Sequence, residues 1–349
     1  MSTCVDSTRR RRPSTRCRSI SPTSRPGPGV RSYCWCSAII NRTLAGGLEL
    51  NRQLNELSRT FESKLHDLHL TAASTERVVA TDLRLSNQPQ LTLVGDDRAI
   101  PPVNIAALRA ARARGAAVAL ASGRMTACIE PFFDGLGIDG PVMAYNGALL
   151  RAERQAARAV LFHRPLRADV VTRLIDFAVS RGLQLNVYCD DVLYGHDDPA
   201  LAPFRAIYSE RTGAVYELAD LRRLRGRGAS KAIFVVDPEE RERLYARWAP
   251  LVDGEASVCR TDPEYLEFMG PGINKGSGLP ALAAYLGIGL DEIAAMGDGD
   301  NDLEMVRRAG AGIAVANAKD GVKRAARFVT RATAAEGAVA EALASLGLA

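Results

Sequence analysis

The chain has few histidines and no clustered cysteines after its first residues, and this scarcity excludes several kinds of site. Its four histidines are dispersed, and neither an HExxH zinc motif nor a Ser-His-Asp arrangement occurs. The cysteines of residues 37–349 stand far apart, and none shows a metal-ligand spacing. Scattered free cysteines predict a reducing compartment, which we take to be the cytoplasm.

The sequence also lacks a secretory leader and an apolar run of transmembrane length, so we expect no membrane partner. Lysine is scarce as well, with five lysines against forty arginines. A lysine at a special position is therefore mildly informative. The alternative for any one lysine is a solvated surface side chain, which is the usual state of this residue.

Positive charge is concentrated at the start of the chain. Residues 1–36 contain eight arginines and one acidic residue, so the formal charge of +5 becomes about −2 for residues 37–349. Pro, Ser and Gly are frequent there and no periodicity appears, which predicts a disordered or extraneous tail over residues 1–76. A helical leucine spacing within residues 43–70 indicates an amphipathic helix. Arg9–Arg12 suits nucleic acid or anionic lipid, although a solvated tail is the more common meaning of this composition. No basic stripe follows, so we expect no nucleic-acid partner for the core.

A cluster of carboxylates follows an apolar run near the end of the chain. Residues 293–296 are apolar, and Asp298, Asp300, Asn301 and Asp302 come directly after them. This pattern predicts a buried strand that ends in an acidic loop, with a helix beginning near Leu303. Carboxylate oxygens in such a loop suit a hard cation such as Mg²⁺. The alternative is an acidic turn that caps a helix.

Three other segments precede this one in the chain. Val78-Val79-Ala80-Thr81-Asp82 and Val118-Ala119-Leu120-Ala121-Ser122-Gly123-Arg124 are apolar strands with polar ends, and Asn274-Lys275-Gly276 opens a helical segment. Together, the four motifs resemble those of the haloacid dehalogenase (HAD) superfamily of phosphohydrolases. The resemblance covers residues 77–349 and is closest to the Cof-type branch (subfamily IIB), which carries a large cap between its second and third motifs.

The resemblance implies catalytic and metal-binding roles for the charged residues. Asp82 matches the nucleophile, which forms an aspartyl-phosphate and so divides one hard displacement into two. Lys275 matches the cation that neutralises charge on the nucleophile and the phosphate. Asp298 matches a Mg²⁺ ligand, and Asp302 is either a ligand or a support of the metal site. Asp82 completes the implied metal set.

The resemblance also implies which residues bind the phosphate. Ser122 matches the hydroxyl that bonds phosphoryl oxygens, and Gly123 permits close approach of the backbone. Asn301 matches a phosphate-contacting amide. Arg124 and Asn146 resemble positions at the mouth of the site, although an exposed arginine and an Asn-Gly turn are equally good interpretations.

The first motif departs from the family pattern. The family has Asp-x-Asp-Gly-Thr, and its second Asp is the general acid and base, whereas Arg84 stands at that position here. Arginine cannot donate and recover a proton at neutral pH. Thr92-Leu93 matches the continuation of the motif, so Arg84–Leu91 replaces an Asp-Gly pair. Either the protein is a natural variant with lost or much reduced turnover, or the sequence carries a local error. We favour the second because the other motifs are intact.

Alternation of strands and helices predicts an α/β fold. We expect a Rossmann-like, doubly wound parallel sheet formed by residues 77–150 and 271–349. Mixed strands and helices predict an inserted α+β cap over residues 151–270, with strands at 161–163, 183–188, 192–195, 231–236 and 257–261 and helices at 168–181 and 238–249. Five polar or aromatic residues are candidates to line the cap's inner wall, namely Asp190, Asp191, Tyr194, His196 and Glu267.

The resulting hypothesis is a Mg²⁺-dependent phosphomonoester hydrolase of a small phosphorylated metabolite, such as a sugar phosphate or a flavin-pathway phosphate. Two alternatives follow from Arg84. The first is a non-catalytic relative that binds a phosphorylated ligand. The second is a phosphotransferase, because loss of the acid and base would lengthen the life of the phosphorylated intermediate.

Overall fold

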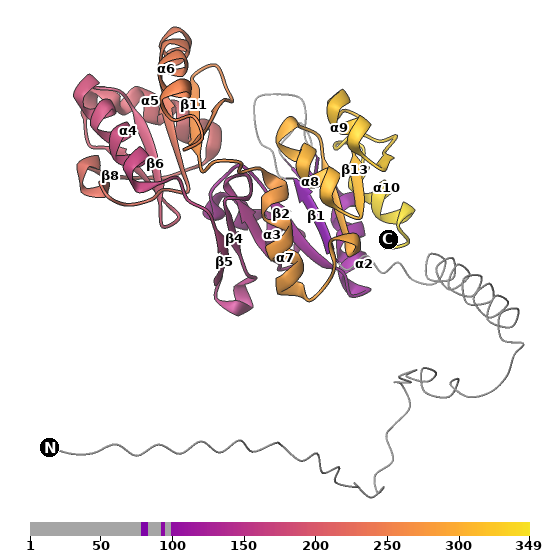
Figure 1. Cartoon of the computed structure of the whole chain (residues 1–349). Helices are drawn as coiled ribbons and strands as arrows, with labels where there is room; N and C mark the ends of the chain where they lie inside the picture. Colours follow the sequence, from indigo (N-terminus) through magenta and orange to yellow (C-terminus); the bar gives the residue numbers. More distant parts are fainter. Residues whose placement is uncertain (1–77, 83–91, 95–98) are drawn as a thin grey trace, which may run out of the picture. The chain divides into compact units, whose positions relative to one another are not determined.

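The computed structural model of the chain describes residues 78–82, 92–94 and 99–349 (Figure 1). For residues 78–82 the structure describes the backbone only. The predicted tail of residues 1–76, the predicted helix within residues 43–70 and the interrupted segment Arg84–Leu91 lie outside the described residues.

Eight strands form the first sheet, in the order β14-β13-β12-β1-β2-β3-β4-β5. β1 (Val78–Asp82) lies inside it and pairs in parallel with β2 (Ala117–Ala121) and β12 (Ile293–Gly297). The other strands are β3 (Val142–Ala144), β4 (Leu149–Arg151), β5 (Val160–His163), β13 (Ala311–Ala314) and β14 (Phe328–Val329). β4 pairs antiparallel with both β3 and β5, and the remaining neighbours are parallel. The short apolar runs of the central strands suit a sheet covered on both faces.

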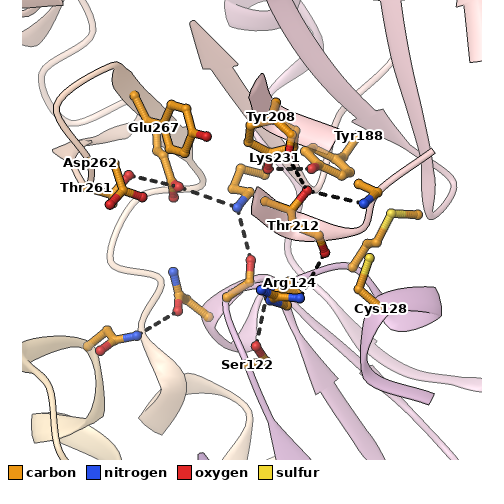
Figure 2. A pocket seen from close by; sticks show the side chains of 16 residues that line it. Ser122, Arg124, Cys128, Tyr188, Tyr208, Thr212, Lys231, Thr261, Asp262 and Glu267 are labelled. Atoms are coloured by element: carbon orange, nitrogen blue, oxygen red, sulfur yellow. Dashed lines mark hydrogen bonds and ion pairs between the residues drawn. The ribbon is translucent and has the colours of Figure 1, made fainter. Parts of the chain in front are cut away.

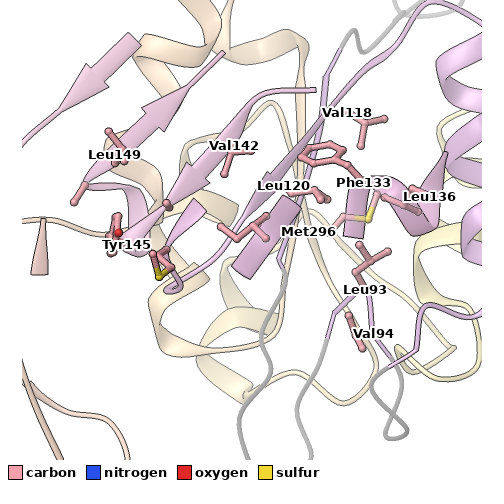
Figure 3. Close-up of a cluster of buried hydrophobic side chains, with 14 of the residues drawn as sticks. Leu93, Val94, Val118, Leu120, Phe133, Leu136, Val142, Tyr145, Leu149 and Met296 are labelled. Carbon is pink, nitrogen blue, oxygen red and sulfur yellow. The ribbon is translucent and has the colours of Figure 1, made fainter. Parts of the chain in front are cut away.

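Both faces of this sheet are covered by helices. Alternate residues of a strand point to opposite faces, and β2 shows the consequence. Val118 and Leu120 join the buried cluster that contains α2, α3 and α10 (Figure 3), whereas Ala119 and Ala121 join the cluster that contains α7 and α8. The helices are α2 (Pro102–Ala113), α3 (Thr126–Leu136), α7 (Leu279–Leu286), α8 (Leu303–Arg308), α9 (Asp320–Ala325) and α10 (Ala338–Ser345). The predicted doubly wound α/β fold is confirmed.

Six strands form the second sheet, in the order β10-β11-β9-β6-β7-β8. They are β6 (Leu185–Cys189), β7 (Val192–His196), β8 (Tyr216–Ala219), β9 (Lys231–Val235), β10 (Ser257–Arg260) and β11 (Tyr265–Met269). One face packs against α4 (Ala168–Arg181) and α6 (Pro238–Leu251) in a cluster that includes Leu174, Phe234 and Trp248. α5 (Ala202–Thr212) supplies Tyr208 to a different buried cluster, with Tyr188 and Ile233 of the sheet's opposite face.

One strand that was predicted in the insert belongs to the core sheet instead. Residues 161–163 were expected in the cap, but β5 pairs antiparallel with β4 and extends the first sheet. A strand's sequence does not identify the sheet that it joins, because pairing is a non-local contact. Leu166 forms a bridge to Ala229, just before β9. We therefore propose that the insert begins near residue 165 and ends near residue 270.

Two strands and one helix of the insert, β8, β11 and α5, were missed by sequence analysis. In the part of the chain that the structure describes, every helix is too short or too polar to cross a bilayer.

Candidate functional site

Three neighbouring parallel strands end at one edge of the first sheet. The register pairs Asp82, the last residue of β1, with Ala121, the last residue of β2. On the other side of β1, Thr81 pairs with Met296, one residue before the end of β12. The loops after β2 and β12 therefore start beside the backbone of Asp82. This arrangement matches the general rule that ligands of open α/β sheets bind at strand carboxyl ends.

Asp298, the first residue after β12, is fully buried and has a hydroxyl neighbour. Its Oδ1 accepts a hydrogen bond of 2.5 Å from Thr92 Oγ1, and Thr92 is also fully buried. Leu93 and Val94, which follow Thr92, pack in the core (Figure 3). These contacts support the predicted register, in which Thr92-Leu93 continues the first motif. A buried carboxylate is costly without hydrogen bonds or a cation, so Asp298 suits a hard metal ion.

Lys275 and Asp302 form a tight buried ion pair beside Asp298. Lys275 Nζ donates to Asp302 Oδ1 at 2.6 Å, and both side chains are completely buried. Asp302 Oδ2 accepts from the backbone N–H groups of Asp298 and Gly299, at 3.0 and 2.9 Å. The carboxylate thus fixes both the lysine and the acidic loop. A carboxylate oxygen has two lone pairs. Oδ2 uses both for these N–H groups, whereas the Lys275 bond uses one lone pair of Oδ1. The metal-ligand role of Asp302 therefore stays a prediction.

Gly297 is required by this packing. A Cβ atom at this position would lie 2.3 Å from Asp302 Cβ and 2.8 Å from Asp302 Cγ. Only glycine lets the end of β12 approach the carboxylate so closely. The residue before the metal-binding candidate is therefore set by the geometry of the Lys275–Asp302 pair.

The turn after β2 presents the predicted phosphate-binding residues. Ser122 is buried, its backbone N–H donates to Met143 O at 2.8 Å, and its carbonyl accepts from Asn146 N at 2.9 Å. A Cβ on Gly123 would lie 3.0 Å from Asn146 Oδ1, so this glycine also permits a close approach. Asn301 Nδ2 donates to that same Oδ1 at 3.1 Å. The structure therefore brings Ser122, Gly123, Asn146 and Asn301 together.

Arg124 extends from this turn toward the insert. Its Nη1 donates to Thr212 O, at the carboxyl end of α5, at 2.8 Å. Asn146 has φ 52°, in the left-handed region that Asn tolerates better than most residues. Both side chains line one pocket with Ser122 and Asn301 (Figure 2). The position of Arg124 and Asn146 in this pocket agrees with their predicted place at the mouth of the site. Their roles in binding phosphate stay predictions.

The wall of the pocket that faces this turn comes from the insert (Figure 2). It includes Tyr188, Lys231 and Glu267. Sequence analysis proposed Glu267 for this wall but missed Tyr188 and Lys231. Lys231 is one of the chain's five lysines, and that scarcity was the signal available. Burial raises the pKa of the Tyr188 hydroxyl well above its usual value, so this side chain is neutral near pH 7.

Asp191 was predicted to line the pocket, but it anchors the β6–β7 turn to the first domain. Its Oδ1 accepts from Tyr145 Oη at 2.7 Å and from Thr126 N at 3.2 Å, and its Oδ2 accepts from Arg151 Nε at 3.1 Å. Asp190 pairs with Arg227 on the exposed surface. Neither carboxylate lines the pocket, and nor do the other two candidates, Tyr194 and His196. A pair of acids in a turn does not reveal which way it faces.

Two carboxylates of the predicted metal set, Asp298 and Asp302, belong to the described side chains. Among those described, no three Asp, Glu, His or Cys side chains lie close enough to hold a metal ion. The Asp82 side chain, the third predicted ligand, lies outside the description. The donor chemistry fits Mg²⁺, because both described members offer oxygen and lie after a strand that borders β1.

Residues 92–343 match the family of haloacid dehalogenase-like hydrolases, which is well over half of the chain. The chain belongs to this family. The match begins at Thr92, so Asp82 and the interrupted segment precede it. Membership confirms the predicted HAD hydrolase identity.

Relatives and solved structures agree with this assignment. An HMP-PP phosphatase of Cronobacter sakazakii is 29% identical over 228 residues, which are 65% of this chain and 81% of that protein. A 5-amino-6-(5-phospho-D-ribitylamino)uracil phosphatase of Bacillus subtilis is 28% identical over 253 residues, covering 70% and 91%. The crystal structure of a haloacid dehalogenase-like hydrolase from Bacteroides thetaiotaomicron matches with TM-score 0.68 and 26% identity, covering 77% of this chain and 99% of that one. A HAD subclass IIB sugar phosphatase shares the fold, with TM-score 0.63 and 22% identity over 78% and 100% of the two chains. The predicted HAD resemblance is confirmed by the family match, and the subclass IIB structure agrees in fold with the predicted Cof-type branch.

Proposed function

We propose that this HAD hydrolase is a Mg²⁺-dependent phosphomonoester hydrolase of a small phosphorylated metabolite, acting through an aspartyl-phosphate on Asp82. The carrying observation is the buried Lys275–Asp302 pair, with its 2.6 Å contact. Asp302 of this pair lies beside Asp298 in the loop after β12, the strand that borders the Asp82 backbone. The phosphatase names of the relatives support the reaction class. Their substrates suggest compounds of similar size, including a sugar phosphate.

The chain's own residues have distinct tasks in this proposal. Asp82 attacks phosphorus and the ester oxygen leaves with its electron pair. Ser122 and Asn301 donate hydrogen bonds to the phosphoryl oxygens, and the Lys275 ammonium offsets their charge. Burial strengthens the effect of that ammonium, because the local dielectric constant is low. Water then cleaves the acyl phosphate and restores the Asp82 carboxylate.

Mg²⁺ would be held by the carboxylates of Asp82 and Asp298, and it would neutralise phosphate charge. For Asp302 we propose either direct ligation or support of the site. Its three hydrogen bonds, to Lys275 and to two backbone N–H groups, favour support. The buried hydroxyl of Thr92 orients Asp298 through the 2.5 Å hydrogen bond.

Proton transfer is the weak step of this chain. The leaving oxygen needs a proton, and the attacking water must lose one, but Arg84 can do neither at neutral pH. Turnover should therefore be slow unless another group acts. Two other functions follow from this single residue, namely binding of a phosphorylated ligand without catalysis and transfer of the phosphoryl group to an acceptor other than water.

The test is Mg²⁺-dependent release of phosphate from an aryl phosphate by three proteins. They are the chain as it stands, a version with Asp-Gly in place of Arg84–Leu91, and Asp82→Asn. We expect fast turnover by the repaired protein, slow turnover by the present chain and none by Asp82→Asn. Turnover by Asp82→Asn would refute the nucleophile assignment. Rapid turnover by the present chain would show that a group other than the missing Asp transfers the proton.

The remaining expectations concern the protein's surroundings. We propose a cytoplasmic location, because the three cysteines of the described domains, Cys128, Cys189 and Cys259, are free thiols. We further propose that the partner is a small phosphorylated metabolite and that the core binds no nucleic acid.

A further inference from the structure

The inner face of the insert's sheet carries a Lys–Glu pair opposite the phosphate-binding turn. Side chains alternate between the two faces of a strand, and Ala232, Phe234, Leu266 and Phe268 all pack against α4 and α6. Lys231 and Glu267 therefore belong to the other face. The register pairs Glu267 with Ile233, two residues from Lys231, so the two charged side chains are diagonal neighbours on adjacent strands.

Lys231 and Glu267 lie on the opposite side of the pocket from Ser122 (Figure 2). Lys231 Nζ donates to Gly123 O at 3.0 Å, and Gly123 follows the predicted phosphate-binding Ser122. Side-chain exposure is 5% for Lys231 and 10% for Glu267. Such burial is rare for lysine and glutamate unless they are paired or bind something. Both side chains line the pocket that also contains Ser122 and Asn301.

The two charges are close without a direct hydrogen bond. Lys231 Nζ lies 3.6 Å from Glu267 Oε1, which is too long for a hydrogen bond. Glu267 Oε1 accepts instead from Thr261 Oγ1 at 3.0 Å. An ammonium group has three N–H donors and a carboxylate has about four acceptor positions. Within the described residues, these contacts leave both groups able to form further hydrogen bonds to a ligand in the pocket.

The electrical neutrality of the pair indicates what that ligand is. A second phosphate or carboxylate would gain attraction from Lys231 but suffer repulsion from Glu267. A hydroxyl group, in contrast, accepts from an ammonium and donates to a carboxylate at the same time. Tyr188, Tyr208 and Tyr265 also line the pocket, and Lys231 Nζ lies 5.5 Å from the centre of the Tyr188 ring. Aromatic rings supply apolar surface for a small ligand, and placed polar groups fix its orientation.

We infer that Lys231 and Glu267 determine specificity by binding hydroxyl groups of the leaving group, and that the substrate is a phosphorylated polyol or sugar rather than an aryl phosphate or a diphosphate. This inference rests on the proposed function, because the phosphoryl group must occupy the Ser122 turn. Both residues act on the leaving group and neither takes part in the transfer of phosphorus.

Binding is measured by calorimetry with Mg²⁺ in the Asp82→Asn protein, in which attack on phosphorus is prevented. The ligands are phenyl phosphate, methyl diphosphate, and a panel of ribose 5-phosphate, glucose 6-phosphate and sorbitol 6-phosphate. The variants Lys231→Met and Glu267→Gln are compared with Glu239→Gln, whose side chain is 88% exposed on α6. Phenyl phosphate serves as an internal check that each variant is folded and binds phosphate.

We expect at least one polyol or sugar phosphate to bind more tightly than phenyl phosphate. Lys231→Met and Glu267→Gln should each weaken that ligand about tenfold or more, the loss typical of a hydrogen bond to a charged group. Phenyl phosphate should change by less than about threefold, and Glu239→Gln should alter neither ligand.

Four results would overturn the inference. If both variants bind all ligands equally more weakly, the pair has a structural or phosphate-binding role. If neither variant changes the affinity for any ligand, the pair does not contact the ligand. Preference for methyl diphosphate, abolished by Lys231→Met alone, would show that Lys231 recognises a second anion. If the parent protein binds none of these esters, the proposed function itself fails and this inference fails with it.

Discussion

Two buried Lys–carboxylate pairs occur among the residues that the structure describes, and their geometries differ. In the core, Lys275 and Asp302 are 2.6 Å apart with completely buried side chains. In the insert, Lys231 and Glu267 are 3.6 Å apart with slight exposure to the pocket. The core pair uses its hydrogen-bonding groups to fix a loop, whereas the insert pair keeps some for a ligand. A lysine and a carboxylate thus hold a loop in place in the core, whereas in the insert we infer that they bind the substrate.

The largest predicted effect comes from breaking the core pair. Lys275→Met leaves the buried Asp302 carboxylate without its cation, and we expect a loss of about 3–5 kcal/mol in the free energy of unfolding. Urea denaturation measures it. The matched control is Lys319→Met, because Lys319 and Asp300 are also 2.6 Å apart but their side chains are 37% and 75% exposed. That variant should lose less than about 1 kcal/mol. Equal losses would mean that burial does not distinguish the pairs.

A second prediction concerns the hydroxyl that supports Asp298. Thr92→Val preserves the shape of the side chain and removes the donor of the 2.5 Å hydrogen bond. We expect the free energy of unfolding of Thr92→Val to fall by about 1.5–3 kcal/mol, the usual value for a hydrogen bond to a charged group. Thr92→Ser keeps the hydroxyl and should recover most of this stability. Mg²⁺ affinity, measured by calorimetry, should fall in Thr92→Val and be retained in Thr92→Ser. An unchanged affinity in both would separate Thr92 from the metal site.

A third prediction tests how closely β12 must approach the core pair. Gly297→Ala places a methyl group 2.3 Å from Asp302 Cβ. We expect destabilisation of about 1–3 kcal/mol from this overpacking. Gly321→Ala is the control, because a Cβ there meets nothing within 4 Å in helix α9. That change should be stabilising by about 0.5–1 kcal/mol. Thermal denaturation compares the two, and a stable Gly297→Ala would contradict the packing argument.

The smallest predicted effect is a change in stability at high pH, caused by two buried tyrosines of the insert. Burial raises the pKa of both Tyr188 and Tyr208 well above the usual value of 10.0. The fold therefore favours the neutral hydroxyls, and this contribution is present below about pH 10 and is lost as the pH rises further. The double variant Tyr188→Phe/Tyr208→Phe removes both groups, which share a 2.7 Å hydrogen bond. Its melting temperature should fall less between pH 9 and pH 11 than that of the parent, as about one or two ionisations are removed. Parallel profiles would exclude these tyrosines as the cause.

The core and its candidate site were predictable because their signals are local. Each strand is a short apolar run, and the polar residues follow directly, as Ser122 follows β2 and Asp298 follows β12. The insert gave weaker signals. α5 buries Arg205 and Tyr208 and so lacks a clear apolar stripe, and β11 contains Glu267 in the middle of an apolar run.

The pocket wall could not be deduced from sequence spacing. Lys231 and Glu267 are far apart in the chain and become neighbours only through the β9–β11 register. Asp191 shows the reverse case, since its local pattern suggested a wall residue and its hydrogen bonds to Tyr145 and Thr126 make it an anchor. Facing direction and strand pairing depend on contacts that a one-dimensional pattern does not contain.

The central claim is that Asp82, Ser122, Lys275 and Asp298 form one site for phosphoryl transfer. A crystal structure of the full chain with Mg²⁺ and beryllofluoride, a mimic of an acyl phosphate, tests it most directly. The account predicts beryllofluoride on the Asp82 carboxylate, with the Ser122 hydroxyl and the Lys275 ammonium donating to its fluorines and Mg²⁺ bound by Asp298. Beryllofluoride on another carboxylate, or Mg²⁺ bound away from Asp298, would contradict it.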